Sequence, residues 1–267
     1  MSEQKLFSWN ETAEALLKFT REQFDSRKQR VHFIEEDDEV NELLNPLGRY
    51  PHAFVLGCIM DRQISAANAW RIPKWVKDAF NFFDMESLSK ISLDELKRVF
   101  NSMEKKHRYP DQMAEYFFHA VQKIHNDYSD DASRIWKDKP SSGLLIYRFM
   151  QFEGVGIKIA TMATNILVRQ FGIELHDKCS IDISPDVHIV RIFQRLGLTS
   201  FSPSDKNKYK TETIYMARAI NPDYPGIFDY PCWFVGSHFC DAQGPKCQKE
   251  DGQCPFFDFC PSRRENK

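Results

Sequence analysis

The feature that most restricts the fold of this 267-residue chain is the spacing of its hydrophobic residues, which recur with a period near 3.6 over most of its length. Alternating, strand-like runs are nearly absent, and short polar or proline-containing joints separate the helical patterns. We therefore predict an all-α fold without internal repeats. The pattern predicts helices over residues 12–24, 52–65, 70–80, 93–103, 113–125, 142–149, 158–171 and 187–196.

Composition is that of a globular protein, with 42% hydrophobic residues. No run of about 18 apolar residues occurs, and the N-terminal segment is polar, so we expect neither a membrane span nor a secretory signal. The expected location is the cytoplasm, in association with the nucleoid if the source is prokaryotic. A net charge of -2 gives no support for a nucleic-acid partner, so any DNA site has to be a local patch.

The composition changes once, near Asn221. From there the chain is rich in proline, glycine, cysteine and aromatic residues, and the helical periodicity is lost. A segment that cannot build its own apolar core needs a covalent or metal staple. We expect the cysteines of this segment to supply one.

Four of the 7 cysteines crowd this tail with the spacing C-x6-C-x6-C-x5-C. In a cytosolic chain such clustering favours metal binding over disulfides, although unrelated reduced thiols are an alternative. Four thiolates suit a tetrahedral zinc ion or an iron-sulfur cluster. Zinc favours pairs separated by two to four residues, so the longer gaps favour the cluster. The predicted ligands are Cys240, Cys247, Cys254 and Cys260.

A glycine turn, Gly154-Val155-Gly156, joins two of the predicted helices. Glycines permit a tight turn and let backbone N–H groups approach a ligand closely, and the following helix start adds positive potential. This arrangement suits a DNA phosphate. Taken alone, the pattern is more typical of a purely structural turn between two helices.

Three segments together resemble one family. Residues 152–160, Phe-Glu-Gly-Val-Gly-Ile-Lys-Ile-Ala, are similar to the hairpin L-P-G-V-G-x-K-T-A of endonuclease III. Residues 184–191 resemble the V-D-x-H-x-x-R-V element of the same family, and residues 232–260 resemble its iron-sulfur loop, in which the cysteines are spaced C-x6-C-x2-C-x5-C. The chain is thus identified as a member of the helix-hairpin-helix (HhH-GPD) DNA glycosylase superfamily, with a middle cysteine gap four residues longer.

The resemblance implies a catalytic pair. It aligns Lys158 with the family's lysine that forms a Schiff base, and Asp186 with the family's catalytic aspartate. An amine attacks a sugar carbon only when unprotonated, and the helix dipole at Lys158 disfavours an ammonium. Ser184 as N-cap and Pro185 at the first helical position place Asp186 in the first turn, where the dipole favours an anion. The rival carboxylates are Asp177 and Asp182; the alternatives for the pair are a phosphate-binding lysine and a capping aspartate.

The resemblance also implies residues that contact DNA. Gln63 matches the glutamine that fills the gap left by a flipped nucleotide, because an amide can hydrogen-bond to the orphaned base. Arg108 and Tyr109 occupy the place of an intercalating wedge, although a basic surface turn is as good an interpretation. His188 follows the catalytic aspartate, and the turn 154–156 is expected on the phosphate backbone.

The implied protein is a base-excision-repair glycosylase with abasic-site lyase activity and a [4Fe-4S] cluster, which acts as a monomer on duplex DNA containing a damaged or mismatched base. Alternatives are a monofunctional glycosylase and a non-catalytic DNA-binding protein. The expected architecture has two helical lobes with DNA in the cleft between them. They are a six-helix barrel over residues 45–170, with the helix-hairpin-helix at about 144–170, and a cluster lobe formed by residues 1–44 and 171–267, with its loop at 232–261.

Overall fold

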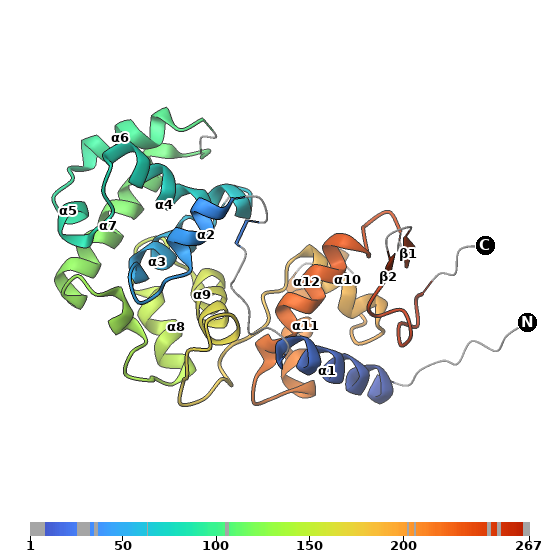
Figure 1. The fold of residues 1–267 in the computed structure, drawn as a ribbon. Coiled ribbons are helices and arrows are strands. Elements are labelled where there is room, and N and C mark those ends of the chain that lie inside the picture. Colours follow the sequence, from blue (N-terminus) through green and yellow to red (C-terminus); the bar gives the residue numbers. More distant parts are fainter. Residues whose placement is uncertain are drawn as a thin grey trace, which may run out of the picture. The chain divides into compact units, whose positions relative to one another are not determined.

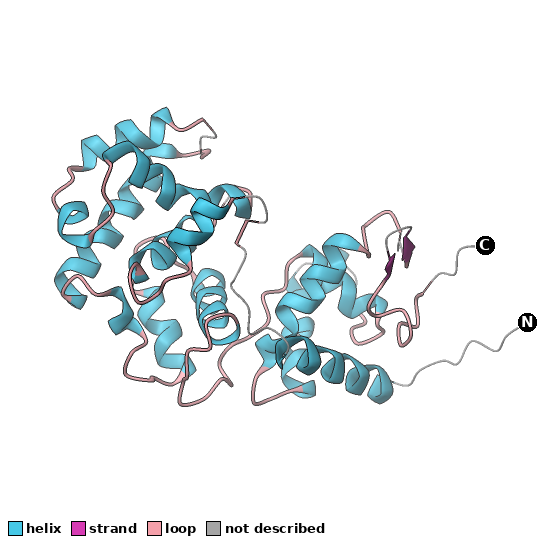
Figure 2. Cartoon of the chain, in the orientation of Figure 1, coloured by secondary structure: helices cyan, strands magenta, loops and turns pink. Residues whose placement is uncertain are grey.

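The computed structural model describes residues 9–25, 33–34, 37–62, 64–104, 107–201, 203–205, 207–244, 247–249 and 252–263. These residues are almost entirely helices and connecting loops (Figures 1 and 2). The strands among them are a single antiparallel pair, β1 (Gln248–Lys249) and β2 (Gly252–Gln253). The prediction of an all-α fold is confirmed. Within the described ranges, no helix has both the length and the hydropathy that crossing a membrane requires.

The chain divides into two compact units. Residues Gln29–His176 form one, here called the hairpin unit, and Met1–Lys28 with Asp177–Lys267 form the other, here called the cysteine unit. The hairpin unit contains α2 (Asp38–Leu44), α3 (Pro51–Met60), α4 (Ala66–Phe80), α5 (Met85–Ser89), α6 (Leu93–Ser102), α7 (Pro110–Tyr128), η1 (Ala132–Ile135), α8 (Ser142–Met150) and α9 (Ile157–Arg169). The cysteine unit contains α1 (Trp9–Asp25), α10 (Val187–Arg195), η2 (Pro203–Asp205), α11 (Asn207–Ile220), η3 (Pro225–Phe228) and α12 (Asp229–His238), followed by β1 and β2.

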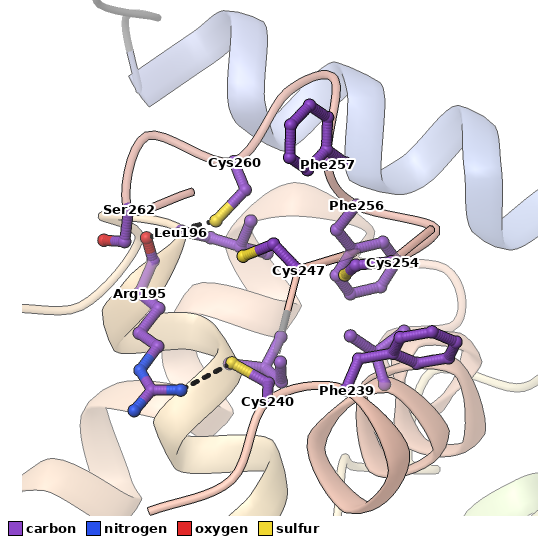
Figure 3. Close-up of a pocket in the computed structure, with 12 residues that line it drawn as sticks. Arg195, Leu196, Phe239, Cys240, Cys247, Cys254, Phe256, Phe257, Cys260 and Ser262 are labelled. Atoms are coloured by element: carbon purple, nitrogen blue, oxygen red, sulfur yellow. Dashed lines mark hydrogen bonds between the residues drawn. The ribbon is translucent and has the colours of Figure 1, made fainter. Parts of the chain in front are cut away.

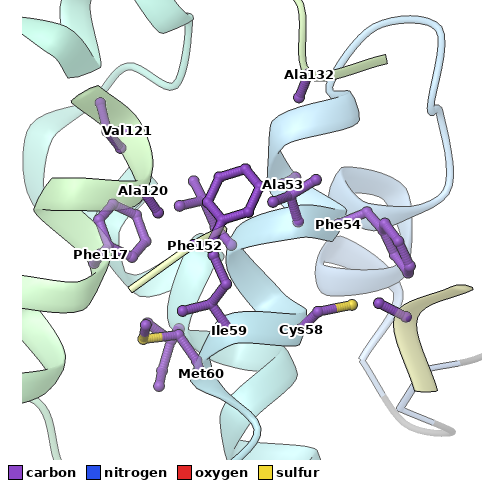
Figure 4. Packing of buried hydrophobic residues seen from close by; sticks show 14 of the residues in the cluster. Ala53, Phe54, Cys58, Ile59, Met60, Phe117, Ala120, Val121, Ala132 and Phe152 are labelled. Atoms are coloured by element: carbon purple, nitrogen blue, oxygen red, sulfur yellow. The ribbon is translucent and has the colours of Figure 1, made fainter. Parts of the chain in front are cut away.

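Helix α3 forms the centre of the hairpin unit. Every residue of α3 is buried, which is typical of a helix that is apolar on all sides. It packs against α2, α4, α7, α9 and η1, and Figure 4 shows Phe54 and Ile59 of α3 within a cluster that includes Phe117 and Phe152. A Cβ atom at Gly57 would lie 2.7 Å from the ring of Trp70. The glycine therefore allows α4 to approach α3 closely.

The ends of two helices differ from the predicted ranges 52–65 and 70–80. Helix α3 ends at Met60, and α4 begins at Ala66 because the side chain of Ser65 accepts a hydrogen bond from the N–H group of Asn68. Residues 61, 62, 64 and 65 therefore belong to a connection between the two helices and not to the end of a helix. This connection carries residues that anchor the candidate site.

Helix α12 contradicts the expectation that helical structure ends near Asn221. Its buried residues include Cys232 and Val235, and it packs against α10. Its apolar side chains are not confined to one face, so a search for helical periodicity misses it.

Helix α2 also lies in a different unit from the one expected. It falls in the segment 1–44 that was expected to pack on the cysteine loop, but Val40 and Leu44 are buried where α2 packs against α3 and α4. The boundary between the units thus precedes α2. The second boundary follows His176 instead of residue 170.

Candidate functional site

The predicted helix-hairpin-helix is formed by α8 and α9. Ser141 caps α8 by accepting a hydrogen bond from the N–H group of Leu144, and the apolar faces of α8 and α9 pack against each other. In the turn between them, Gly154 has a φ of +79°, a conformation that residues with a Cβ rarely adopt. Gly156 is the N-cap of α9 and brings no side-chain cap. The first N–H groups of α9 therefore have no partner within the helix.

The turn is anchored by Arg62, a residue that the sequence analysis did not single out. Its guanidinium group donates a 2.7 Å hydrogen bond to the carbonyl oxygen of Gly154 and lies 5.0 Å from the ring centre of Tyr116. A Cβ atom on Gly154 would come within 2.5 Å of Arg62 Nη1. The backbone carbonyl of Arg62 is in turn hydrogen-bonded to the imidazole of His107. These contacts hold the turn at the end of α3.

Lys158 lies in the first turn of α9, and its side chain is exposed. Its ammonium group interacts electrostatically with the carboxyl group of Asp61, the C-cap of α3. Burial raises the pKa of the Asp61 carboxyl, and the ammonium group of Lys158 opposes that rise. Lys158 therefore shares an electrostatic environment with a carboxyl group in the same unit.

Asp186 is the N-cap of α10 and so lies just before the first helical turn, in the cysteine unit. Its Oδ1 atom accepts hydrogen bonds of 2.9 Å from the N–H groups of both His188 and Ile189. The expected N-cap, Ser184, does not cap: its N–H group donates to Asp229 over 2.7 Å. The predicted N-cap is therefore two residues too early, whereas α10 begins at Val187, where the helical pattern over 187–196 predicts it.

The two rival carboxylates have different surroundings. The guanidinium group of Arg218 donates two hydrogen bonds of 2.7 Å, one to each carboxylate oxygen of Asp182. Asp177 accepts a weak hydrogen bond from the thiol of Cys179 over 3.4 Å. The Asp182 carboxylate is thus held in a bidentate ion pair, whereas Asp186 uses one oxygen to cap its helix.

His188 and Arg191 connect α10 to α12. A Cβ atom on Gly236 would lie 2.8 Å from the Cβ of His188, so α10 and α12 are in close contact at this glycine. Arg191 donates hydrogen bonds to the carbonyl oxygens of Gly236 and Cys240, over 2.7 and 2.5 Å. It also contacts His188 Nδ1 at 3.0 Å. These contacts connect the helix that Asp186 caps to the first cysteine of the loop.

The longer middle gap of the cysteine pattern is taken up by a β-hairpin. Gln248 pairs with Gln253 and Lys249 with Gly252, in the antiparallel strands β1 and β2. At the base of the hairpin, the N–H group of Cys254 donates a 2.8 Å hydrogen bond to the carbonyl oxygen of Cys247. Because a hairpin returns to its starting point, the extra residues leave these two cysteines side by side.

All four predicted cysteine ligands line a single pocket (Figure 3). Burial raises the pKa of the Cys254 thiol to about 12 and that of Cys260 to about 11, and the neighbouring thiols add to the rise. Arg195 donates a 2.8 Å hydrogen bond to the sulfur of Cys240 and brings a positive charge to the pocket. Ser262 and six apolar side chains complete the lining; the apolar ones are Ile192, Leu196, Val235, Phe239, Phe256 and Phe257. In the described part of the chain, no three or more His, Cys, Asp or Glu side chains form a group that would hold a metal ion.

The remaining predicted DNA contacts lie in the hairpin unit. Tyr109, the N-cap of α7, has 46% of its surface exposed, and the guanidinium group of Arg108 lies 5.3 Å from its ring centre. The N–H group of Tyr109 donates to His107 Nδ1 over 3.2 Å. Gln63 lies outside the described residues. The wedge proposed from the sequence is thus an exposed pair of side chains on a hydrogen-bonded turn.

The chain matches one family model and has a fold similar to that of several solved structures. The sequence model for "HhH-GPD superfamily base excision DNA repair protein" matches residues 56–215, more than half of the chain. The fold is similar to a solved structure of a trapped endonuclease III–DNA covalent intermediate, with a TM-score of 0.58 and 17% identity over 96% of this chain and 97% of that chain. A non-covalent endonuclease III–DNA complex gives a TM-score of 0.57 at 17% identity, with the same coverage of both chains.

A third similar structure is a thermostable thymine-DNA glycosylase, with a TM-score of 0.56 and 16% identity over 95% of this chain and 97% of that chain. At this level of identity the solved structures establish a common fold. No curated protein sequence matches the chain.

Proposed function

The chain belongs to the HhH-GPD superfamily of base excision DNA repair proteins, a superfamily of DNA glycosylases, and we propose that it is a bifunctional member with abasic-site lyase activity. The observation that carries the proposal is the position of Lys158. It lies two residues after the Gly154-Val155-Gly156 turn, at the exposed start of α9. A lysine in this place can reach a substrate that the turn binds.

The turn is proposed as a phosphate site. The N-terminus of α9 presents N–H groups without helical partners together with the positive end of the helix dipole, which suits an anion. The hydrogen bond from Arg62 to Gly154 holds the turn in one conformation. Because the turn is already ordered, its backbone loses little conformational entropy when DNA binds, and Lys158 is held close to the bound strand.

The proposed reaction begins with a damaged or mismatched nucleotide flipped out of the duplex, because its C1' carbon cannot be reached inside the base stack. The base leaves with the electron pair of the glycosidic bond, and the unprotonated Nζ of Lys158 forms a bond to C1'. Asp186 stabilises the positive charge that develops on the sugar. Opening of the sugar ring gives an imine; loss of a C2' proton then breaks the C3'–O bond and cuts the strand.

Asp186 is preferred over Asp182 for a structural reason. Its Oδ1 atom is fixed by two N–H groups, which leaves Oδ2 without a role in the cap. Both oxygens of Asp182 are engaged by Arg218. An aspartate held rigidly at a helix start, with one oxygen uncommitted to the cap, is the better group to stabilise a developing cation.

Four further residues are proposed to contact DNA. Arg108 and Tyr109 form an exposed stacked pair that suits insertion beside the flipped nucleotide. Gln63 is proposed to hydrogen-bond to the orphaned base. His188, two residues after Asp186, is proposed to contact the phosphate backbone of the DNA. The partner is double-stranded DNA, bound by a monomer, and the proposed compartment is the cytoplasm.

The pocket lined by Cys240, Cys247, Cys254 and Cys260 is proposed to hold a [4Fe-4S] cluster. Four thiols surround an apolar space, and the β-hairpin keeps the two middle cysteines adjacent despite the longer gap. A cubane binds one thiolate at each iron, so its ligands surround a volume and do not converge on a point. When bound, the cluster would fasten the cysteine loop against α10, with Arg195 offsetting its negative charge.

A monofunctional glycosylase is the second candidate. The observation in its favour is the exposure of Lys158 at a helix start, where an ammonium group is also well placed to bind a phosphate. In that case Lys158 strengthens DNA binding without forming a covalent bond. The two candidates differ in whether an imine is formed.

Base release from a panel of lesion-containing and mismatched duplexes tests the glycosylase proposal. Asp186→Asn is expected to lower the single-turnover rate of base release by at least about 100-fold. It is expected to retain DNA binding. Asp182→Asn is the matched control, because it removes a carboxylate that is engaged in an ion pair. Full activity in Asp186→Asn with a large loss in Asp182→Asn would move the role to Asp182.

A further inference from the structure

Asp61 is a carboxylate that the proposed reaction does not yet use. It ends α3 as the C-cap, with its N–H group bonded to the carbonyl oxygen of Cys58 over 3.2 Å. Its side chain is half-buried, and among the described residues its carboxylate has no hydrogen bond or ion pair within contact distance. A desolvated carboxylate without a hydrogen-bonding partner is costly to keep in a fold.

The position of Asp61 is fixed relative to Lys158. Both residues belong to the hairpin unit, and α3 packs directly against α9. The next residue, Arg62, bonds to the carbonyl oxygen of Gly154, four residues before Lys158. The end of α3 and the start of α9 are therefore joined by a direct hydrogen bond as well as by helix packing.

The electrostatics connect the same two residues. Burial raises the pKa of Asp61, and among the described residues the Lys158 ammonium is the one charged group that lowers it. The negative end of the α3 dipole also favours a cation near this carboxyl and disfavours its anion. The other titratable groups around this corner are the buried thiol of Cys58 on α3, His107 against the Arg62 carbonyl, and Tyr116 on α7 beneath the Arg62 guanidinium.

We propose that Asp61 accepts the proton that Lys158 must lose before it attacks C1'; this inference rests on the proposed lyase function. One proton passes from the Lys158 ammonium to a carboxylate oxygen of Asp61, directly or through one water molecule. The products are a neutral amine and a neutral carboxylic acid, so net charge is conserved. The amine electron pair is then available for the bond to C1'.

Binding of DNA supplies the driving force for this transfer. A bound strand displaces water from around Lys158 and Asp61. Loss of this water disfavours the charged ammonium and carboxylate relative to the neutral amine and carboxylic acid. The ammonium and carboxylate therefore become a less stable pair when the substrate arrives. The division of labour follows: Asp61 prepares the nucleophile, and Asp186 stabilises the sugar cation.

The rate at which borohydride traps the enzyme on an abasic-site duplex, measured in single turnovers from pH 6 to 9.5, tests the proposal. In the wild type, Asp61 removes the proton internally, so the rate is expected to change little above neutral pH. In Asp61→Asn the amine has to lose its proton to the solvent. The rate is then expected to fall about 100-fold at pH 7, to rise about tenfold per pH unit, and to approach the wild-type rate at alkaline pH.

Asp61→Glu is expected to restore the flat profile, because it keeps the carboxylate. Asp78→Asn is the matched control, an exposed aspartate of the hairpin unit that pairs with Lys74; its profile should equal that of the wild type. An Asp61→Asn rate that equals the wild type, or that falls by one factor at every pH, would overturn the proposal while the lyase function stands. Absence of any wild-type adduct would overturn both.

If Asp61→Asn does not fold, the wild-type and Asp61→Glu profiles decide the matter. A wild-type rate that rises tenfold per pH unit across neutral pH shows that the proton goes to the solvent and contradicts the proposal. Flat profiles in both proteins, with a faster wild type, support it.

Discussion

The guanidinium group of Arg62 donates a 2.7 Å hydrogen bond to the carbonyl oxygen of Gly154 and so joins the end of α3 to the turn that precedes Lys158. The partners are separated by 92 residues in the sequence. Gly154 accepts this contact because it has a positive φ and no side chain to collide with Arg62 or Tyr116. The geometry of the proposed phosphate site thus depends on a distant arginine as well as on its glycines.

The first prediction concerns the turn. Gly154→Ala places a Cβ 2.5 Å from Arg62 Nη1 and 2.9 Å from the Tyr116 ring, in a backbone with a φ of +79°. We expect a loss of about 1–3 kcal/mol in the free energy of unfolding, measured by urea denaturation, and weaker DNA binding. Gly156→Ala is the control for the unfolding measurement alone, since its Cβ would meet nothing within 4 Å and its φ is −93°. Equal losses in the two variants would contradict the anchoring by Arg62.

A second prediction concerns the β-hairpin in the cysteine loop. Deletion of residues 249–252 shortens the middle gap to two residues, the spacing of the family pattern. Because Cys247 and Cys254 are already adjacent, we expect the shortened chain to bind the same amount of iron per protein after anaerobic reconstitution as the full chain. Cys254→Ser is the matched loss-of-ligand variant and is expected to bind less. Loss of iron binding in the deletion variant would show that the longer gap is needed to position the thiols.

The buried thiols predict how the stability of the metal-free protein depends on pH. The folded pKa of Cys254, about 12, and that of Cys260, about 11, lie above the value near 9 of an exposed thiol. The contribution of each thiol to stability is therefore fully present below about pH 9 and is lost as the pH rises through the folded pKa. Above about pH 9, each thiol lowers the free energy of unfolding by at most about 1.4 kcal/mol per pH unit.

Thermal denaturation of the metal-free protein at pH 7, 9 and 10.5 measures this loss. We expect the midpoint to fall more steeply above pH 9 in the wild type than in Cys254→Ser, which lacks one of the titrating groups. Parallel curves for the two proteins would show that Cys254 is not buried in the absence of metal.

Some of the fold and the site is predictable from local sequence and some is not. The helix-hairpin-helix is recognisable because its glycines and the helices beside it are contiguous in sequence. The N-cap of α10 is predicted two residues early because Ser184, Pro185 and Asp186 all favour a helix start, and local sequence does not show the bond from Ser184 to Asp229.

Long-range contacts account for what the sequence analysis missed. Arg62 has no local signal, since its partners lie on α7 and in the turn before α9. Asp61 resembles any polar residue after a helix until burial and the charge of Lys158 are known. The middle cysteine gap looked like a departure from the family pattern, because a count of residues does not reveal a hairpin.

The central claim is that Lys158 forms the covalent bond to the sugar. Borohydride trapping on an abasic-site duplex, followed by peptide mapping of the adduct, tests it most directly. We predict an adduct at Lys158 that is absent in Lys158→Ala and present in Lys139→Ala, which removes an exposed lysine paired with Glu174 in the same unit. A wild type that forms no adduct, or a Lys158→Ala variant that still forms one, would contradict the account.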